Sequence, residues 1–256
     1  MTNILKERLR GGALLAGSWL NSGSAVAAEI AAQADLDWLL IDREHGAGSE
    51  ADVAMQLLAV EAGGSAAVVR AAGIDAAELK RILDLGPAGV MIPTVDTEAQ
   101  AREVVRFTRI APLGERQTAT STRAVRYGRD YARYLRENNG ELLAVVQIES
   151  RTAVANAGAI AAVEGVDVLF VGPTDLGMSM GVDPNEGTAS FREALAEVVA
   201  AAHRAGKWAG ILARNEEQAR EFWKMGFQMI AMGSDRGILA AGFDRAASAL
   251  AALRSE

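Results

Sequence analysis

Residues 142–149 read LLAVVQIE, residues 167–171 read DVLFV, and residues 152–162 between them are rich in alanine. Each of the two outer runs is short and almost continuously apolar, which is typical of a parallel strand that is covered on both faces. The alanine-rich segment has the period of a helix. Together the three segments predict a strand, a helix and a second strand that lies parallel to the first.

The same alternation runs along the whole chain. It predicts eight strands, at residues 14–20, 38–42, 66–70, 89–93, 142–149, 167–171, 208–212 and 228–232. It also predicts nine helices, at residues 24–34, 50–63, 75–85, 97–106, 131–138, 152–162, 190–205, 215–225 and 235–254. Eight such units in 256 residues predict an α/β fold, a (β/α)8 TIM barrel that forms a single domain over residues 1–256. A doubly wound open sheet is the alternative, but residues 17–24, GSWLNSGS, match neither a GxGxxG fingerprint nor a P-loop.

The composition excludes several classes of protein. Hydrophobic residues make up 50% of the chain, which is enough for a sizeable core, and the absence of cysteine excludes a disulfide framework and a thiol nucleophile. The 33 acidic and 26 basic residues give a formal charge of −7, which argues against nucleic acid or an anionic membrane as the partner. No targeting signal and no apolar segment of about 20 residues is found, so we expect a cytoplasmic protein.

Polar residues cluster where the predicted strands end. The second strand leads into residues 42–46, DREHG, the third ends at Arg70, the fifth ends in Gln147 and Glu149, and the sixth leads into Thr174 and Asp175. In a (β/α)8 barrel the carboxyl ends of all eight strands meet at one face, where the active site lies. The sequence therefore predicts an active site built from these side chains.

Glu149 and Asp175 are candidate ligands for a cation. They follow neighbouring strands, whose axes lie about 4.8 Å apart in a sheet. Two carboxylates that leave the other positions to water and substrate are the usual protein ligands of Mg²⁺ or Mn²⁺. The structural alternatives are a helix N-cap for Asp175 and an ion pair with Arg151 for Glu149.

Arg70 and His45 are candidate catalytic groups. An arginine that ends a buried strand needs an anionic partner, which is either a structural aspartate or the carboxylate or enolate of a substrate. His45 follows a buried strand and could act as a general base.

The four lysines, Lys6, Lys80, Lys207 and Lys224, lie where none is expected to reach this face, which disfavours a Schiff base.

Residues 112–140 form an irregular segment with six arginines and three tyrosines. This segment is either a solvated loop and helix or a subunit contact, or it attracts a carboxylate substrate to the active site. The sequence leaves both readings open.

Several segments, in order along the chain, resemble the metal-dependent class II pyruvate aldolases, of the 4-hydroxy-2-oxoheptane-1,7-dioate and 2-dehydro-3-deoxyglucarate aldolase type. They are residues 37–45, DWLLIDREH; 68–70, VVR; 89–93, GVMIP; 146–149, VQIE; and 170–176, FVGPTDL. The resemblance spans nearly the whole chain. It implies a (β/α)8 barrel in a homohexamer whose C-terminal helix is exchanged between subunits. It also implies an enzyme that cleaves or forms 4-hydroxy-2-oxoacids from pyruvate or hydroxypyruvate and an aldehyde.

The resemblance assigns a role to each matching residue. Glu149 and Asp175 are similar to the ligands of a divalent metal, Mg²⁺, Mn²⁺ or Co²⁺, and Arg70 to the residue that binds substrate and stabilises the enolate. His45 resembles the proton acceptor, and Gln147 and Thr174 align with substrate contacts.

Asp84 resembles the acid that raises the basicity of the family's histidine. It ends a helix that runs toward the opposite face of the barrel, so its pairing with His45 requires a neighbouring subunit or unusual packing, and Asp42 is the competing partner. The sequence departs from the family at Arg43, where glycine is usual, in the Gly-Ala-Gly after His45, and at Thr174 and Gly177-Met178, and these departures affect substrate choice.

Three other functions remain as alternatives. An acyl-CoA thioester lyase related to citrate lyase would use the arginine-rich segment for the phosphates of CoA. An isomerase would bind a substrate phosphate at Gly233 and Ser234, where the last helix begins. A non-catalytic barrel would act only in binding or assembly.

Overall fold

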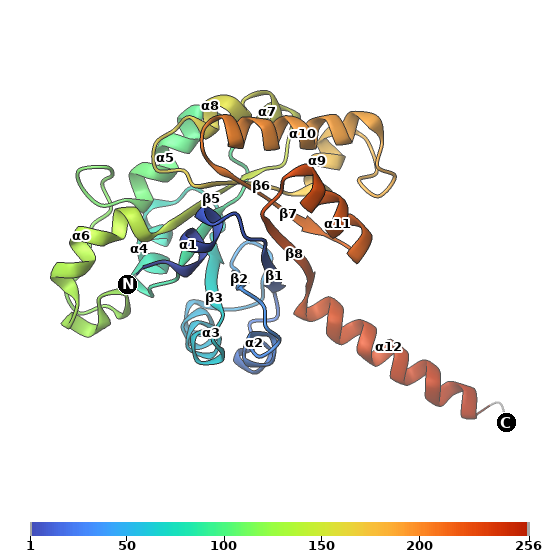
Figure 1. The fold of residues 1–256 in the computed structure, drawn as a ribbon. Helices are drawn as coiled ribbons and strands as arrows, with labels where there is room; N and C mark the ends of the chain where they lie inside the picture. Colours follow the sequence, from blue (N-terminus) through green and yellow to red (C-terminus); the bar gives the residue numbers. More distant parts are fainter. Residues whose placement is uncertain (1, 255–256) are drawn as a thin grey trace.

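A computed structural model describes residues 2–254 of the chain, and eight parallel strands close into a barrel in sequence order. Figure 1 shows the strands at the centre and the helices around them. The strands are β1 (Leu15–Leu20), β2 (Trp38–Asp42), β3 (Ala66–Arg70), β4 (Gly89–Ile92), β5 (Leu143–Ile148), β6 (Val168–Val171), β7 (Trp208–Ala213) and β8 (Met229–Ser234). The predicted (β/α)8 barrel and its eight strands are confirmed, with differences of one or two residues at several ends.

A helix follows each strand, and one further helix, α1, precedes β1. The helices are α1 (Ile4–Arg10), α2 (Ala25–Ala32), α3 (Glu50–Gly63), α4 (Ala76–Asp84), α5 (Glu98–Thr108), α6 (Tyr131–Glu141), α7 (Arg151–Ala155), α8 (Ala157–Ala161), α9 (Pro173–Met180), α10 (Ala189–Arg204), α11 (Glu216–Met225) and α12 (Asp235–Leu253), with a 3-10 segment, η1 (Arg123–Gly128). The helix expected at residues 152–162 is divided at Asn156, whose side chain donates to the carbonyl of Asp96. Two helices, α1 and α9, were not expected from the sequence.

Aromatic side chains fill the interior of the barrel. Trp19, Trp38 and Phe170 come from three strands and pack with their ring centroids 5.6–6.0 Å apart. Glycine makes room for two of these rings, because a Cβ at Gly17 would lie 2.2 Å from Trp38 and one at Gly210 would lie 2.4 Å from Phe170. Such a tightly packed interior fixes the strand ends, and the side chains that follow them, relative to one another.

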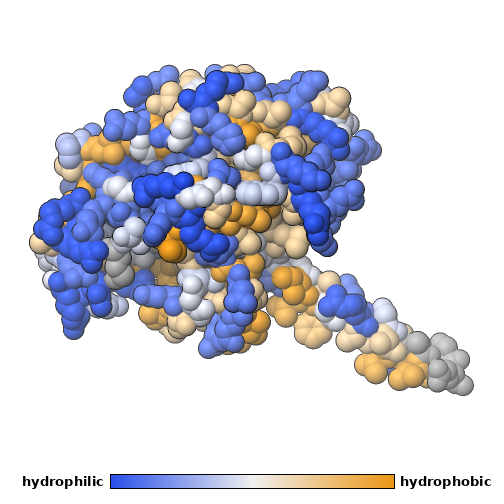
Figure 2. Space-filling view, viewed as in Figure 1, coloured by the Kyte–Doolittle hydropathy of each residue, from blue (hydrophilic) through white to orange (hydrophobic). Residues whose placement is uncertain are grey.

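The last helix, α12, leaves the body of the molecule (Figure 1). Ile238, Leu239, Phe243 and Leu250 of this helix are exposed, and Figure 2 shows hydrophobic residues along it. On the barrel, Val26 and Ile30 of α2 are exposed as well. Apolar surface is thus uncovered both on α12 and on the outer layer of helices. Within residues 2–254 no helix is long and apolar enough to cross a membrane.

Candidate active site

The parallel register brings the ends of β2 and β3 together. Asp42 and Arg70 are the last residues of these strands and lie opposite each other in the sheet. Arg70 Nε donates to Asp42 Oδ1 at 2.9 Å and Nη2 donates to Oδ2 at 2.8 Å, so the aspartate binds one edge of the guanidinium. The side chain of Asp42 is 0% exposed. Of the two anionic partners that the sequence left open for Arg70, the structure contains the aspartate.

The electrostatics of this pair favour its charged form. Burial raises the pKa of Asp42, but the hydrogen bonds and the positive charge of Arg70 outweigh burial, and the pKa lies below its usual range. The opposite edge of the guanidinium meets two further groups, because Nη1 lies 2.7 Å from Glu44 Oε2 and 3.3 Å from Gln147 Oε1. Arg70 is therefore held in one orientation at the mouth of the barrel.

Glu149 follows β5 and is buried beside this arginine. Its Oε1 accepts from the backbone N–H of Thr94 at 2.8 Å, and its Oε2 accepts from Gln147 Nε2 at 3.2 Å. Burial raises the pKa of Glu149 to about 7, and the negative charges of Asp175 and Glu44 act in the same direction. The site thus contains a buried acid whose negative charge is poorly compensated.

The residues around Glu149 leave space for its carboxylate. A Cβ at position 172 would lie 2.5 Å from Glu149 Oε2, so Gly172 is needed to leave space for the carboxylate. The expected alternative, an ion pair with Arg151, is not found, because Arg151 donates to the backbone carbonyls of Ser179 and Met180 instead.

Asp175 lies in the first turn of α9, and Gly172 is the N-cap of that helix. Asp175 is therefore not the N-cap residue that the sequence also allowed. Thr174, beside it, is exposed, and its hydroxyl accepts from Arg214 Nη2 at 3.4 Å. Among residues 2–254 there is no cluster of three or more histidine, cysteine or acidic side chains that could hold a metal ion.

His45 lies in the loop after β2 with a side chain that is 70% exposed. Its Nε2 is 3.8 Å from Glu44 Oε1, whereas Asp42 accepts only the backbone N–H of His45. Burial raises the pKa of Glu44, although the charges of Arg70 and His45 oppose this shift. Within one chain the carboxylate nearest to the imidazole is thus Glu44.

Asp84 is the last residue of α4 and lies at the far end of the barrel. Its Oδ1 is 4.0 Å from Arg116 Nη1, and burial raises its pKa. The structure therefore groups Arg70, Gln147, Glu149, Asp175 and His45 at the mouth and leaves Asp84 apart from them. Thr174 adjoins this group through Asp175.

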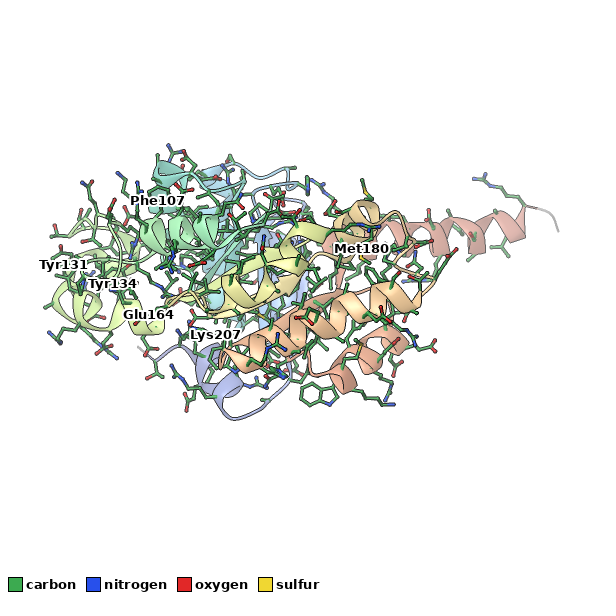
Figure 3. The ribbon with its side chains drawn as sticks, turned by 90° about the horizontal axis from the view of Figure 1, so that it is seen from above. Phe107, Tyr131, Tyr134, Glu164, Met180 and Lys207 are labelled. Atoms are coloured by element: carbon green, nitrogen blue, oxygen red, sulfur yellow. The ribbon has the colours of Figure 1, made fainter. Side chains whose placement is uncertain are left out.

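The arginine-rich segment also lies at the far end. Figure 3 shows Tyr131 and Tyr134 of α6 at the end of the molecule away from α12, on the side of Glu164 and Lys207, which precede β6 and β7. Residues of η1 and α6, together with residues that precede β3 and β4, line an open groove of about 740 Å³ there. Within one chain this segment does not border the mouth, which weakens the idea that it attracts substrate.

The sequence assigned no role to several residues of the mouth. Glu44 lay within residues 42–46 of the predicted active site, next to His45, and its role could have been identified from that position. Asn21 and Asp235 gave no such signal, because they meet only where β1 and β8 close the barrel. At the start of α12, Ser234 Oγ accepts from the N–H of Gly237 at 3.2 Å, so one of the N–H groups expected for a phosphate is already bound.

The fold and the rim of arginine, histidine and acids define the class of protein. The family model described as HpcH/HpaI aldolase/citrate lyase matches residues 15–241, and the chain belongs to this family. The resemblance to class II aldolases is confirmed, and the protein is an enzyme of the aldolase type, a carbon–carbon lyase.

Individual relatives agree with this assignment. The chain is 39% identical over 246 residues to 2-keto-3-deoxy-L-rhamnonate aldolase of Escherichia coli O157:H7, covering 96% of this chain and 92% of the relative. A solved HpcH/HpaI aldolase/citrate lyase family protein from Burkholderia cenocepacia J2315 has 38% identity and a TM-score of 0.90, over 97% of this chain and 99% of that one. The HpcH/HpaI aldolase from Desulfitobacterium hafniense DCB-2 has 29% identity and a TM-score of 0.89, over 96% of each chain.

Proposed function

We propose that this enzyme is a divalent-metal-dependent aldolase that cleaves or forms 4-hydroxy-2-oxoacids. Its donor would be a 2-oxoacid, pyruvate or hydroxypyruvate, and its acceptor an aldehyde. The observation that carries the proposal is the meeting of a fixed arginine, Arg70, with a buried and poorly compensated acid, Glu149, at the mouth of the barrel. The name of the E. coli relative specifies a 2-keto-3-deoxy acid, which supports a 2-oxoacid substrate here.

Glu149 and Asp175 would hold the divalent cation, Mg²⁺, Mn²⁺ or Co²⁺. The fit rests on hard carboxylate oxygens and on the raised pKa of Glu149, which is caused by burial and, to a smaller extent, by the like charges of Asp175 and Glu44. A cation would offset both effects. When bound, such a cation supplies Lewis-acid polarisation of the substrate's oxygens.

Arg70 would stabilise the negative charge that develops on the keto oxygen of the donor. Asp42 binds Nε and Nη2, so Nη1 is the nitrogen that faces Gln147 and Glu44. A guanidinium that is oriented before the reaction needs no reorganisation when the charge appears, which is why fixed donors lower a barrier effectively. Gln147 and Thr174 would position the substrate.

His45 would move the proton at the donor carbon or at the aldol hydroxyl. Its imidazole would take up the proton, and the carboxylate of Glu44 lies 3.8 Å from Nε2. In this proposal Asp84 of a neighbouring copy assists His45, because Asp84 of the same chain lies at the opposite end of the barrel.

The proposed assembly is a homohexamer in which α12 is exchanged between subunits. Exposed apolar residues on α12, such as Phe243, and on α2, such as Ile30, support burial of both surfaces against another copy.

The test is release of pyruvate from a 4-hydroxy-2-oxoacid, measured with EDTA and then with Mg²⁺, Mn²⁺ or Co²⁺ added back. We expect EDTA to abolish release and a divalent ion to restore it. Glu149→Gln should remain inactive when the ion is restored, whereas Glu164→Gln, an exposed acid at the far end, serves as the matched control.

Two outcomes would contradict the proposal. Full activity in EDTA would mean that Glu149 and Asp175 do not bind an essential metal. Absence of pyruvate release under every condition, with cleavage of an acyl-CoA thioester instead, would favour the lyase alternative.

A further inference from the structure

We infer that Asn21 and Asp235 are positioning residues for Arg70, and that through them the base of α12 controls the geometry of the active site. Among the hydrogen bonds and ion pairs of residues 2–254, Arg70 is joined to Asp42, Glu44 and Gln147 and not to Asn21 or Asp235 directly. The inference rests on the role proposed above for Arg70.

The first link joins α12 to the loop after β1. Asp235 is the first residue of α12, and only 8% of it is exposed. Its carboxylate accepts the backbone N–H groups of Asn21, at 2.9 Å, and of Ser22, at 3.1 Å, as well as the Ser22 hydroxyl. Three hydrogen bonds to one buried charge fix this loop, because breaking them would leave the carboxylate unsatisfied.

The second link joins that loop to the Arg70 pair. Asn21 Nδ2 donates to Asp42 Oδ2 at 2.5 Å, the same oxygen that accepts from Arg70 Nη2. Because Asp42 binds the guanidinium at two points, a rotation of its carboxylate would turn the guanidinium with it. Asn21 therefore sets the orientation of Arg70 through Asp42.

A third set of contacts reaches the loop that carries His45. The backbone carbonyl of Asn21 accepts the N–H of Ala47 at 2.9 Å, and Arg236 Nη1 donates to the carbonyl of His45 at 3.4 Å. The Arg70 side chain and the backbone of the loop that carries His45 are thus both connected to the first two residues of α12.

The direction of α12 therefore affects the geometry of the active site. Figure 1 shows α12 extending away from the barrel beyond this connection. Whatever fixes the direction of α12 also fixes Asp235, the loop after β1 and, through Asp42, the guanidinium. Restraint of α12 by a second copy would then favour the active geometry.

The test compares kcat and KM of Asn21→Ala, Asp235→Asn and the double variant with those of Ser24→Ala. Ser24 belongs to the same loop and caps α2 through the N–H of Ala27, but it has no contact with Asn21 or Asp42 among the hydrogen bonds of residues 2–254. A misplacement of about 1 Å can reduce a rate about 100-fold, so we expect each single variant to lose about 10- to 100-fold in kcat with a smaller change in KM. Ser24→Ala should stay within about twofold of the unchanged enzyme, as expected for a side chain outside the connection.

The kcat of the double variant distinguishes a positioning role of these residues from general destabilisation of the protein. If Asp235 acts through Asn21, the double variant should be no slower than the slower single variant. The inference would be overturned if the fold-losses in kcat of the two single variants multiply in the double variant. It would also be overturned if Asn21→Ala had the same kcat as Ser24→Ala. Circular dichroism at the assay temperature would establish that each variant is folded. If Asp235→Asn does not fold, the comparison of Asn21→Ala with Ser24→Ala still tests the inference.

Arg70→Ala separates this inference from the proposed function. Full activity of Arg70→Ala would contradict the role of Arg70 itself. Loss of activity in Arg70→Ala, with Asn21→Ala and Asp235→Asn unaffected, would contradict only the connection to α12.

Discussion

At the scale of single residues, Arg70 and Asp42 depend on each other. Both are buried, and the arginine would be costly at this position without a carboxylate. The pair is formed because the two residues end neighbouring strands in register. The pair holds a positive charge in a fixed direction, because the guanidinium keeps the pKa of Asp42 below its usual range.

This dependence predicts two separable effects of Arg70→Ala. Pyruvate release should be abolished, and the free energy of unfolding should fall by about 3–5 kcal/mol, because Asp42 becomes a buried charge without a cationic partner. The double variant Arg70→Ala with Asp42→Asn should recover part of this stability without activity. Urea unfolding and steady-state rates would measure both; a double variant as unstable as Arg70→Ala would contradict the explanation.

Glu149 predicts a pH dependence of stability in metal-free enzyme. The pKa of Glu149 is raised from 4.5 to about 7 in the folded state, so the folded protein binds this proton more tightly than the unfolded chain does. The free energy of unfolding should therefore fall as the pH rises from about 4.5 to about 7, by up to about 3 kcal/mol. Urea unfolding in EDTA should show that the free energy of unfolding of Glu149→Gln falls less with rising pH than that of the unchanged enzyme. If it falls equally in both proteins, another group is responsible.

At the scale of elements, α1 has a structural role at the end of the barrel away from the mouth. Asn3 caps this helix, and Leu5 and Leu9 join the apolar cluster inside the barrel. Lys6 of the same helix lies 2.8 Å from Asp167, which precedes β6 and is also 2.8 Å from Arg109. One carboxylate thus forms ion pairs with two buried cations and attaches α1 to the barrel.

Asp167→Ala should be strongly destabilising and have little effect on catalysis. It leaves Lys6 and Arg109 buried without an anion, for which we expect a loss of about 3–5 kcal/mol in the free energy of unfolding. The exposed pair of Glu197 and Arg204 provides the control, since Glu197→Ala should cost less than about 1 kcal/mol. Urea unfolding would measure the free energy of unfolding of Asp167→Ala and of Glu197→Ala. A change in KM for Asp167→Ala would contradict a purely structural role.

At the scale of the whole molecule, the candidate site is divided between the two ends of the barrel. His45 is exposed at the mouth, while Asp84 lies near Arg116 at the far end, beside the groove lined by η1 and α6. A single chain cannot bring these two residues together. Contact between the far end of one copy and the mouth of another would do so.

This arrangement predicts complementation between inactive subunits. His45→Ala and Asp84→Ala should each be impaired, but mixing and reassembling them should create sites with His45 from one chain and Asp84 from another. Random mixing in equal amounts gives such sites in about a quarter of positions, and recovered activity should approach that fraction. No recovery from mixtures that have reassembled would show that Asp84 does not act across a subunit boundary.

Much of the fold follows from local patterns in the sequence. Continuous apolar runs and helical periods identified all eight strands, and the carboxyl ends of those strands predicted where Arg70, Gln147 and Glu149 would lie. These features depend on residues that are near one another in the chain. The short helix α9 was missed because it begins immediately after β6, at Pro173, with few residues to establish a period.

The sequence by itself determined the barrel, its order of strands and the chemical types of side chain at the mouth. Only the tertiary structure decided which of these side chains meet: Asp42 and Glu44 with Arg70, and Asp235 with the loop after β1. The physical reason is that hydrophobic periodicity is a property of residues close together in the chain and indicates which of them are buried. The contacts, in contrast, depend on the register of neighbouring strands and on closure of the barrel between β1 and β8. This closure brings together residues more than 200 positions apart.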